Sequence, residues 1–360
     1  MPLSPQDTAF PQGSLVLVTG SNGYIGSHIA DQVLLAGYHV RGTVRDASKA
    51  EWTTKLFAER HGAGKYSAVV VPDMAVEGAF DDAVKGSASH PVCLFAPLTS
   101  PGVQGIIHSA SVISFSPDPA AVIPQTILGV TTLLRSASRS PSVKSFVLTS
   151  SSVAVANPTP DNSPSTITTT TWNDAAIAEA WSVTSPPFPA NAPTAVYSAS
   201  KAESEKALWD FVEKEKPSFR VNAILPDANF GAVLNTDAPM STGAWIRGVF
   251  AGNVDFVKVL LPAWYINVAD TARLHVAALL DTRVENERIF GFAGPYTWNG
   301  ILAILRSLYP GKTFPEDLPV SEVSKLSVPK ERGEQLLKEV FGREWVSLED
   351  TVKENVAGLE

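Results

Sequence analysis

Short runs of apolar, β-branched residues alternate along the chain with longer stretches in which apolar residues recur at helical spacing. The run at residues 14–19 is followed by a helical pattern over residues 25–37 and by a second run at 38–44. This pattern predicts a strand, a helix and a strand in that order. Alternation of this kind predicts an α/β fold, in which a doubly wound parallel sheet is covered by helices on both faces. Further strands are expected at residues 67–71, 105–108, 145–148 and 220–225.

Two segments interrupt this alternation. Residues 156–193 are rich in Thr, Pro, Asn and Ser and hold little apolar periodicity, which predicts a long surface excursion. Residues 86–103 contain three prolines and Cys93, and they read as a loop.

After Pro226 the composition changes, which predicts a smaller C-terminal lobe. We expect a dinucleotide-binding domain over residues 13–225 to which residues 265–285 return. The substrate-binding lobe is then expected to comprise residues 226–264 and 286–360.

Composition excludes several classes of protein. The chain carries 28 basic and 36 acidic side chains, a net charge of −8, and shows no basic cluster that could neutralise a nucleic-acid backbone. A single cysteine excludes an intramolecular disulfide and a multi-cysteine zinc site, and the six histidines show no metal-ligand spacing. A charged residue, a proline or a glycine interrupts every apolar segment before it is long enough to span a membrane. The first residues do not resemble a secretory signal. We therefore expect a cytoplasmic protein without metal, nucleic-acid or membrane partners.

A glycine cluster follows the first predicted strand. Gly20, Gly23 and Gly26 form a GxxGxxG motif that also contains Tyr24 and Ile25. Glycines at a strand-to-helix turn let a pyrophosphate approach backbone N–H groups at the positive end of the helix. The motif predicts dinucleotide binding, although glycine-rich turns also have purely structural roles.

The end of the second predicted strand distinguishes the two nicotinamide cofactors. An acidic residue there would hold the ribose 2′-hydroxyl of NAD. Instead Arg45 ends the strand, with Arg41 upstream and Lys49 close behind. Their charges would pair with a 2′-phosphate, so NADPH is favoured. The acidic Asp46 keeps NAD possible as the cofactor, and the two arginines could simply be charges exposed to solvent.

Two further motifs carry polar chemistry. Tyr197 and Lys201 form a YxxxK motif at the start of the helical run 198–214, so both side chains share one helix face. A neighbouring ammonium favours the phenolate and makes Tyr197 a usable acid or base. Serines follow the strand at 145–148, where open α/β sheets bind ligands. Each motif alone is unspecific, but their order along the chain favours an active site.

These motifs resemble the extended short-chain dehydrogenase/reductase family. The resemblance rests on VTGSNGYIG at residues 18–26, LTSSS at 148–152 and YSASK at 197–201. The sequence is most similar to the dihydroflavonol-reductase-like branch that includes yeast and fungal NADPH-dependent aldehyde and carbonyl reductases. VRGTVRD at 40–46 and NVADTARLHVAAL at 267–279 support that branch. The resemblance implies a Rossmann-type sheet with a smaller C-terminal lobe.

The resemblance also implies roles for individual residues. Ser151 would polarise a substrate carbonyl, with Ser150 and Ser152 as possible substitutes. Tyr197 would donate the proton, and Lys201 would bind the nicotinamide ribose and acidify Tyr197. On the cofactor, Arg45 would hold the 2′-phosphate, Asp73 and Met74 would lie beside the adenine, and Pro226 would border the nicotinamide.

We therefore expect NADPH-dependent reduction of a small aldehyde or ketone, keto esters included, by a monomer or homodimer. Phe230, Trp245 and Phe250 could line an apolar substrate pocket or simply fill the core of the lobe. Three alternatives use the same fold: a sterol-type dehydrogenase, a nucleotide-sugar epimerase or dehydratase, and a non-catalytic dinucleotide sensor. Arg45 argues against an enzyme that keeps NAD bound. The presence of both Tyr197 and Lys201 argues against a sensor.

Overall fold

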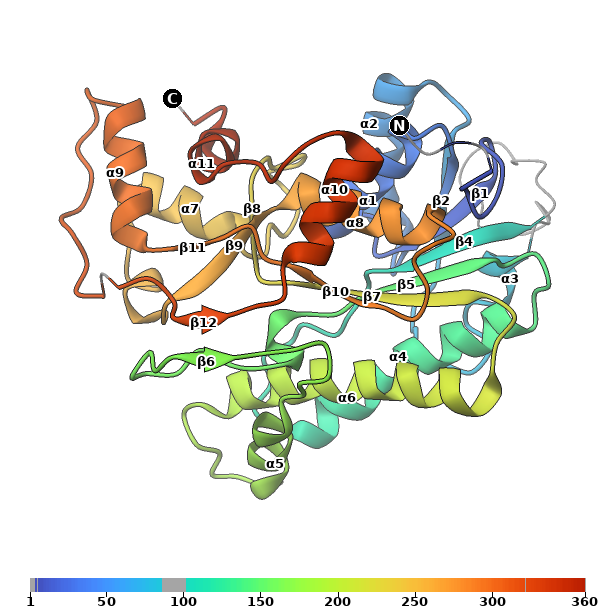
Figure 1. Cartoon of the computed structure of the whole chain (residues 1–360), viewed down its shortest axis with the longest axis horizontal. Helices are drawn as coiled ribbons and strands as arrows, with labels where there is room; N and C mark the ends of the chain where they lie inside the picture. Colours follow the sequence, from blue (N-terminus) through green and yellow to red (C-terminus); the bar gives the residue numbers. More distant parts are fainter. Residues whose placement is uncertain (1–3, 5, 86–101, 321, 360) are drawn as a thin grey trace.

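A parallel β-sheet forms the centre of the computed structural model, which describes the chain except for residues 1–3, 5, 86–101, 321 and 360 (Figure 1). The described residues form seven strands in this sheet, in the order β10-β7-β5-β4-β1-β2-β3. All six predicted strands are present within a few residues of their expected bounds. The seven strands of the sheet are β1 (Leu15–Thr19), β2 (His39–Val44), β3 (Tyr66–Val70), β4 (Val103–His108), β5 (Ser145–Thr149), β7 (Arg220–Pro226) and β10 (Arg288–Gly291).

Helices cover both faces of the sheet, as the alternating pattern predicts. One face carries α1 (Tyr24–Leu35), α2 (Glu51–His61), α8 (Val268–Leu280) and α10 (Glu331–Phe341), and the other α3 (Asp81–Val84), α4 (Pro119–Ser138) and α6 (Ala192–Glu215). β1 shows why this arrangement is stable. Val16 and Val18 belong to one hydrophobic core and Leu15 and Leu17 to the other, because successive side chains of a strand point to opposite faces.

The C-terminal lobe has its own small sheet and core. β8 (Ala228–Phe230), β9 (Ala263–Asn267) and β11 (Gly294–Tyr296) form the sheet, and α7 (Gly243–Phe250), α9 (Trp298–Leu308) and α11 (Leu348–Val356) pack around it. Phe230 and Phe250 are buried in this core and Trp245 packs against it, with ring contacts from Phe230 to Trp245 and Trp298. Phe230 and Phe250 therefore fill the core of the lobe.

The excursion at residues 156–193 contains regular structure that the sequence did not predict. α5 (Asp174–Ser182) packs on α6, and β6 (Ser165–Thr166) pairs in parallel with β12 (Leu326–Ser327). The excursion thus joins the lobe to the helices below the sheet (Figure 1). Cys93 and most of the second loop-like segment lie outside the described residues.

The chain also returns to the main sheet after residue 285. β10 pairs with β7, and Leu336, Leu337 and Val340 of α10 belong to the core around α1 and α8. The range 286–360 expected for the lobe therefore includes a strand and a helix that pack with the sheet. No helix formed by the described residues combines the length and apolar character that a bilayer crossing requires.

Candidate active site

The carboxyl ends of β1 and β4 meet where the strand order of the sheet reverses, which is where open α/β sheets bind ligands. Thr19 Oγ1 at the end of β1 lies 2.8 Å from His108 Nδ1 at the end of β4. The same oxygen accepts hydrogen bonds from the backbone N–H groups of Ser109 and Ala110. Burial, with a smaller contribution from the charge of Lys201, lowers the pKa of His108 to about 3. His108 is therefore a neutral residue that joins the two strand ends.

The glycine turn fits a pyrophosphate. Gly20 adopts a left-handed φ of 64°, and a Cβ on Gly26 would lie 2.2 Å from the Gly20 carbonyl oxygen. Gly23 caps α1 without a side-chain hydrogen bond, and no acidic residue lies in the first turn. The backbone N–H groups at this positive helix end are thus suited to an anion.

Tyr24 and Ile25 differ in their surroundings. The Tyr24 hydroxyl donates to the Gly231 carbonyl oxygen at 3.1 Å, so its side chain holds the lobe against α1. The side chain of Ile25 packs against the core between α1 and α8. Only the backbone N–H groups of these two residues remain candidates for cofactor binding.

The two arginines near the end of β2 have different surroundings. Arg45 directly follows the strand and is exposed, as is Lys49 in the short 3₁₀ helix η1 (Ala47–Ala50). Arg41 is buried and its Nη1 donates to the carbonyl oxygens of Ala83 and Lys85, at 2.8 and 2.6 Å. Its long side chain thus holds the end of α3, and the hypothesis that Arg41 contributes a charge to the cofactor site is wrong.

The residues expected beside the adenine follow β3. Asp73 is exposed, and its Oδ1 accepts a hydrogen bond from the Ala75 N–H at 2.9 Å. Met74 is half-buried and lies against Gly129 of α4, while its carbonyl oxygen accepts from Thr132 at 2.6 Å. Both residues lie on the same sheet edge as Arg45, because β2 and β3 are parallel neighbours.

The serine turn and α6 bring three predicted residues together. Ser151 caps the 3₁₀ helix η2 (Ser152–Ala154) shortly after β5, and its hydroxyl lies close enough to the Tyr197 phenol to lower the pKa of that phenol. Lys201, one helical turn after Tyr197, extends its Nζ to 3.4 Å from the Thr149 carbonyl oxygen. Two hydroxyls and an ammonium therefore converge beyond the carboxyl end of β5.

Burial dominates the titration of both α6 residues. It raises the pKa of Tyr197, and the hydrogen bond from Ser151 opposes it. Burial also lowers the pKa of Lys201 to about 8, while the negative charge of Glu205 opposes that shift. From the sequence we expect Lys201 to lower the pKa of Tyr197. Instead the phenol stays protonated at neutral pH, because burial disfavours its charged form.

The two flanking serines have other partners. Ser150 Oγ donates to Glu205 Oε2 at 2.6 Å, and Ser152 Oγ donates to Asp227 Oδ1 at 3.1 Å. Ser151 is thus the member of the serine turn whose hydroxyl meets Tyr197. Of the two carboxylates, Glu205 has a sequence signal, since it follows Lys201 by four residues on the same helix face.

Pro226 ends β7 next to Asp227 and pairs with Gly291 of β10. Asp227 also accepts a hydrogen bond from the Trp264 N–H of β9 at 3.0 Å. Burial raises the pKa of Asp227 to about 6. Asp227 therefore connects the serine turn with the lobe, and no periodic pattern in the sequence marks it.

One further aromatic residue borders the site. The ring of Phe115 lies 5.4 Å from the ring of Tyr197, centroid to centroid, and Phe115 is exposed with a left-handed φ of 48°. Nothing in the local sequence distinguishes Phe115 from an ordinary loop residue.

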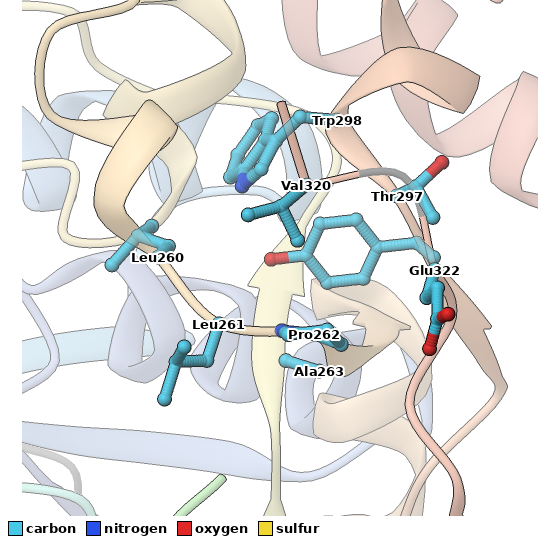
Figure 2. A pocket seen from close by; sticks show the side chains of 9 residues that line it. Leu260, Leu261, Pro262, Ala263, Thr297, Trp298, Val320 and Glu322 are labelled. Carbon is cyan, nitrogen blue, oxygen red and sulfur yellow. The ribbon is translucent and has the colours of Figure 1, made fainter. Parts of the chain in front are cut away.

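The structure contains two small pockets, one in the lobe and one beside the glycine turn. Figure 2 shows one of them in the lobe, where Leu260, Leu261 and Trp298 face Val320 and Glu322. Tyr296 also lines it and is close enough to Asp227 for that charge to contribute to raising the pKa of its phenol. The other lies between the glycine turn, Trp52 and residues 233–240. The second pocket adjoins the expected pyrophosphate site, whereas no residue that lines the first belongs to the serine turn or to α6.

The fold and the glycine turn define a dinucleotide-binding protein with a Rossmann-type sheet. Residues 16–290 match the NAD dependent epimerase/dehydratase family, and the chain belongs to that family. It is 36% identical to aldehyde reductase 2 of Sporidiobolus salmonicolor over 97% of both chains. It is 35% identical to ketoreductase adrE of Penicillium rubens over 98% of both chains. The structure of yeast methylglyoxal/isovaleraldehyde reductase Gre2, complexed with NADPH, shares the fold with a TM-score of 0.78, at 24% identity over 95% of this chain and 97% of that chain.

Proposed function

We propose that this chain is an NADPH-dependent carbonyl reductase that converts an aldehyde or ketone to the alcohol. The observation that carries the proposal is the convergence of Ser151, Tyr197 and Lys201 beyond β5. Two relatives covered over nearly their whole length are named an aldehyde reductase and a ketoreductase. These names support carbonyl reduction over the epimerase reaction that the family name also includes.

The proposed cofactor site follows the edge of the sheet. The glycine turn and the N-terminus of α1 would bind the pyrophosphate through the backbone N–H groups of Gly23, Tyr24, Ile25 and Gly26. Exposed Arg45, with Lys49 nearby, would pair with the 2′-phosphate, and an exposed guanidinium is free to do so. Asp73 and Met74 would adjoin the adenine, and Pro226 the nicotinamide. NADPH supplies the hydride when bound.

The residues of the chain would provide the remaining chemistry. Tyr197, whose pKa is raised by partial burial, would donate its proton to the carbonyl oxygen as negative charge develops there. Ser151 would donate a second hydrogen bond to the same oxygen. Lys201 would hold the nicotinamide ribose and stabilise the phenolate left on Tyr197 by its positive charge.

The substrate would be a small-molecule carbonyl compound held between the serine turn and the lobe. A cytoplasmic location and a monomeric or homodimeric state remain predictions.

One assay tests the proposal. Purified protein is mixed with NADPH or NADH and a panel of aromatic aldehydes, α-keto esters and simple ketones, and the absorbance of the reduced nicotinamide is followed. We expect oxidation of NADPH with at least one class and slower or no oxidation of NADH. Lack of turnover with both cofactors across the panel would overturn the proposal.

A further inference from the structure

Glu205 is a fully buried carboxylate that the proposed mechanism does not use. It lies on α6 four residues after Lys201, which itself follows Tyr197 by four residues, so the three side chains share one face of the helix. Burying a carboxylate is costly unless several donors compensate for its lost hydration. The partners of Glu205 therefore indicate what this carboxylate does.

Its partners come from three separate elements. Ser150 of the serine turn donates to Oε2 at 2.6 Å. Arg288 of β10 donates from Nε to Oε1 at 2.7 Å, and Trp209 of α6 donates to the same oxygen at 3.1 Å. Glu205 thus fixes the residue that directly precedes Ser151.

Arg288 extends this network to the excursion. Its side chain is 7% exposed, and its Nη1 donates to the carbonyl oxygens of Thr169 and Thr171 at 2.9 and 2.8 Å. The guanidinium also lies 3.8 Å from the centre of the Trp172 ring. A planar guanidinium can make all of these contacts at once, whereas an ammonium cannot.

The charge of Glu205 also acts on Lys201. Tyr197 and Glu205 lie four residues on either side of Lys201 on α6, and the charge of Lys201 also acts on His108 of β4. His108 is neutral above about pH 3. The negative charge of Glu205 therefore opposes the lowering of the Lys201 pKa by burial.

We propose that Glu205 is a positioning residue that holds the serine turn against α6 and places a negative charge one helical turn from Lys201, and that Arg288 couples this carboxylate to residues 169–172. The inference rests on the proposed function, because it assigns Glu205 to the same site. It predicts that removing the charge of Glu205 changes the titration of Lys201 as well as the turnover.

The direct test is a ¹³C NMR titration of protein labelled at lysine Cε, in which Lys201→Met identifies the Lys201 resonance. We expect its inflection near pH 8 in the unmodified chain. In Glu205→Gln we expect it about one pH unit lower, because an adjacent opposite charge is removed. Glu203→Gln is the matched control: Glu203 lies on the same helix but accepts from Trp181 at 2.9 Å instead. An unchanged inflection in Glu205→Gln would overturn the proposal.

Turnover gives a second measurement. In Glu205→Gln the alkaline limb of kcat/KM should move to lower pH by the same amount, while the Kd for NADPH at pH 6.5 stays within a few-fold of its original value. If turnover is lost but the alkaline decrease in kcat/KM stays at its original pH, Glu205 has only a structural role. Because the NMR titration requires no turnover, a chain that reduces no carbonyl would contradict the proposed function without affecting this test.

Unpaired Arg288 could prevent Glu205→Gln from folding. The double variant Glu205→Gln/Arg288→Met removes both charges and avoids a buried unpaired cation. We expect it to fold and to show the lower Lys201 inflection, since Glu205 is the charge that acts on Lys201. An inflection at the original pH in the double variant would also overturn the proposal.

Discussion

The Ser151 hydroxyl lies close enough to the Tyr197 phenol, across the junction between the serine turn and α6, to lower the pKa of that phenol. Ser151 caps η2, and its Oγ also lies 3.4 Å from the Val153 N–H. The Tyr197 ring also lies against the Phe115 ring, with their centroids 5.4 Å apart. The two hydroxyls are therefore held close enough to bond the same carbonyl oxygen.

Tyr197→Phe should remove the proton donor and leave the shape of the site intact. We expect kcat to fall by about 10²- to 10⁴-fold, the usual contribution of general acid catalysis, with little change in the Kd for NADPH. Steady-state rates and a fluorescence titration of NADPH measure the two quantities. If the variant no longer bound NADPH, Tyr197 would have a structural role instead.

Alanine substitutions in the serine turn should distinguish Ser151 from Ser152. Ser151→Ala should lower kcat by about 100-fold, because one hydrogen bond to the developing oxyanion is lost. Ser152→Ala removes a bond to Asp227 and should lower kcat by less than about tenfold. Rates at saturating NADPH compare the variants, and a larger effect for Ser152→Ala than for Ser151→Ala would transfer the assigned role to Ser152.

Much of the fold follows from the sequence because a buried parallel sheet imposes a simple pattern. Strands buried on both faces become short, largely apolar runs, as LVLVT of β1 and SFVLT of β5 illustrate. β10 escaped prediction because it has only four residues and begins with Arg288. The helix α5 and the strand β6 were missed because their segment is dominated by residues typical of loops.

The site was predictable where chemistry depends on spacing along one element. The positions of Tyr197 and Lys201 on α6 follow from the helical repeat. Long-range contacts were not predictable in this way. Arg41 resembles a strand-end charge in the sequence, but its side chain reaches the carbonyl oxygens of Ala83 and Lys85. Likewise, the contact between Ser152 and Asp227 joins distant segments of the chain.

Arg45→Ala tests the cofactor preference. A hydrogen bond to a charged group contributes about 1.5–3 kcal/mol, so the KM for NADPH should rise by about 10- to 100-fold. The KM for NADH should change little, because NADH lacks the 2′-phosphate. Lys49→Ala provides a comparison from the same exposed segment and should have a smaller effect. Equal changes for both cofactors in Arg45→Ala would exclude Arg45 from its proposed role.

Gly26→Ala tests the packing of the glycine turn. Its Cβ would lie 2.2 Å from the Gly20 carbonyl oxygen, so the turn must shift. We expect the free energy of unfolding to fall by about 3 kcal/mol and NADPH binding to weaken, as measured by urea unfolding and by fluorescence titration. Gly311→Ala is the control, because a Cβ there has no neighbour within 4 Å. Unchanged stability in Gly26→Ala would contradict the close approach.

The pH dependence of reduction should depend on Lys201. Burial lowers the pKa of this ammonium to about 8, so its positive charge is present below pH 8 and is lost as the pH rises further. We expect kcat/KM for carbonyl reduction to be level near pH 7 and to fall about tenfold per unit above pH 8.

Lys201→Arg provides the test of that assignment, because a guanidinium keeps its charge throughout this range. The variant should be slower at pH 7, since the longer planar group fits less well, but its alkaline limb should disappear or move to much higher pH. A limb that stays near pH 8 in Lys201→Arg would assign the titration to another group. The other buried bases do not compete for that assignment: burial lowers the pKa of His275 to about 4 and that of His108 to about 3, so both are neutral throughout.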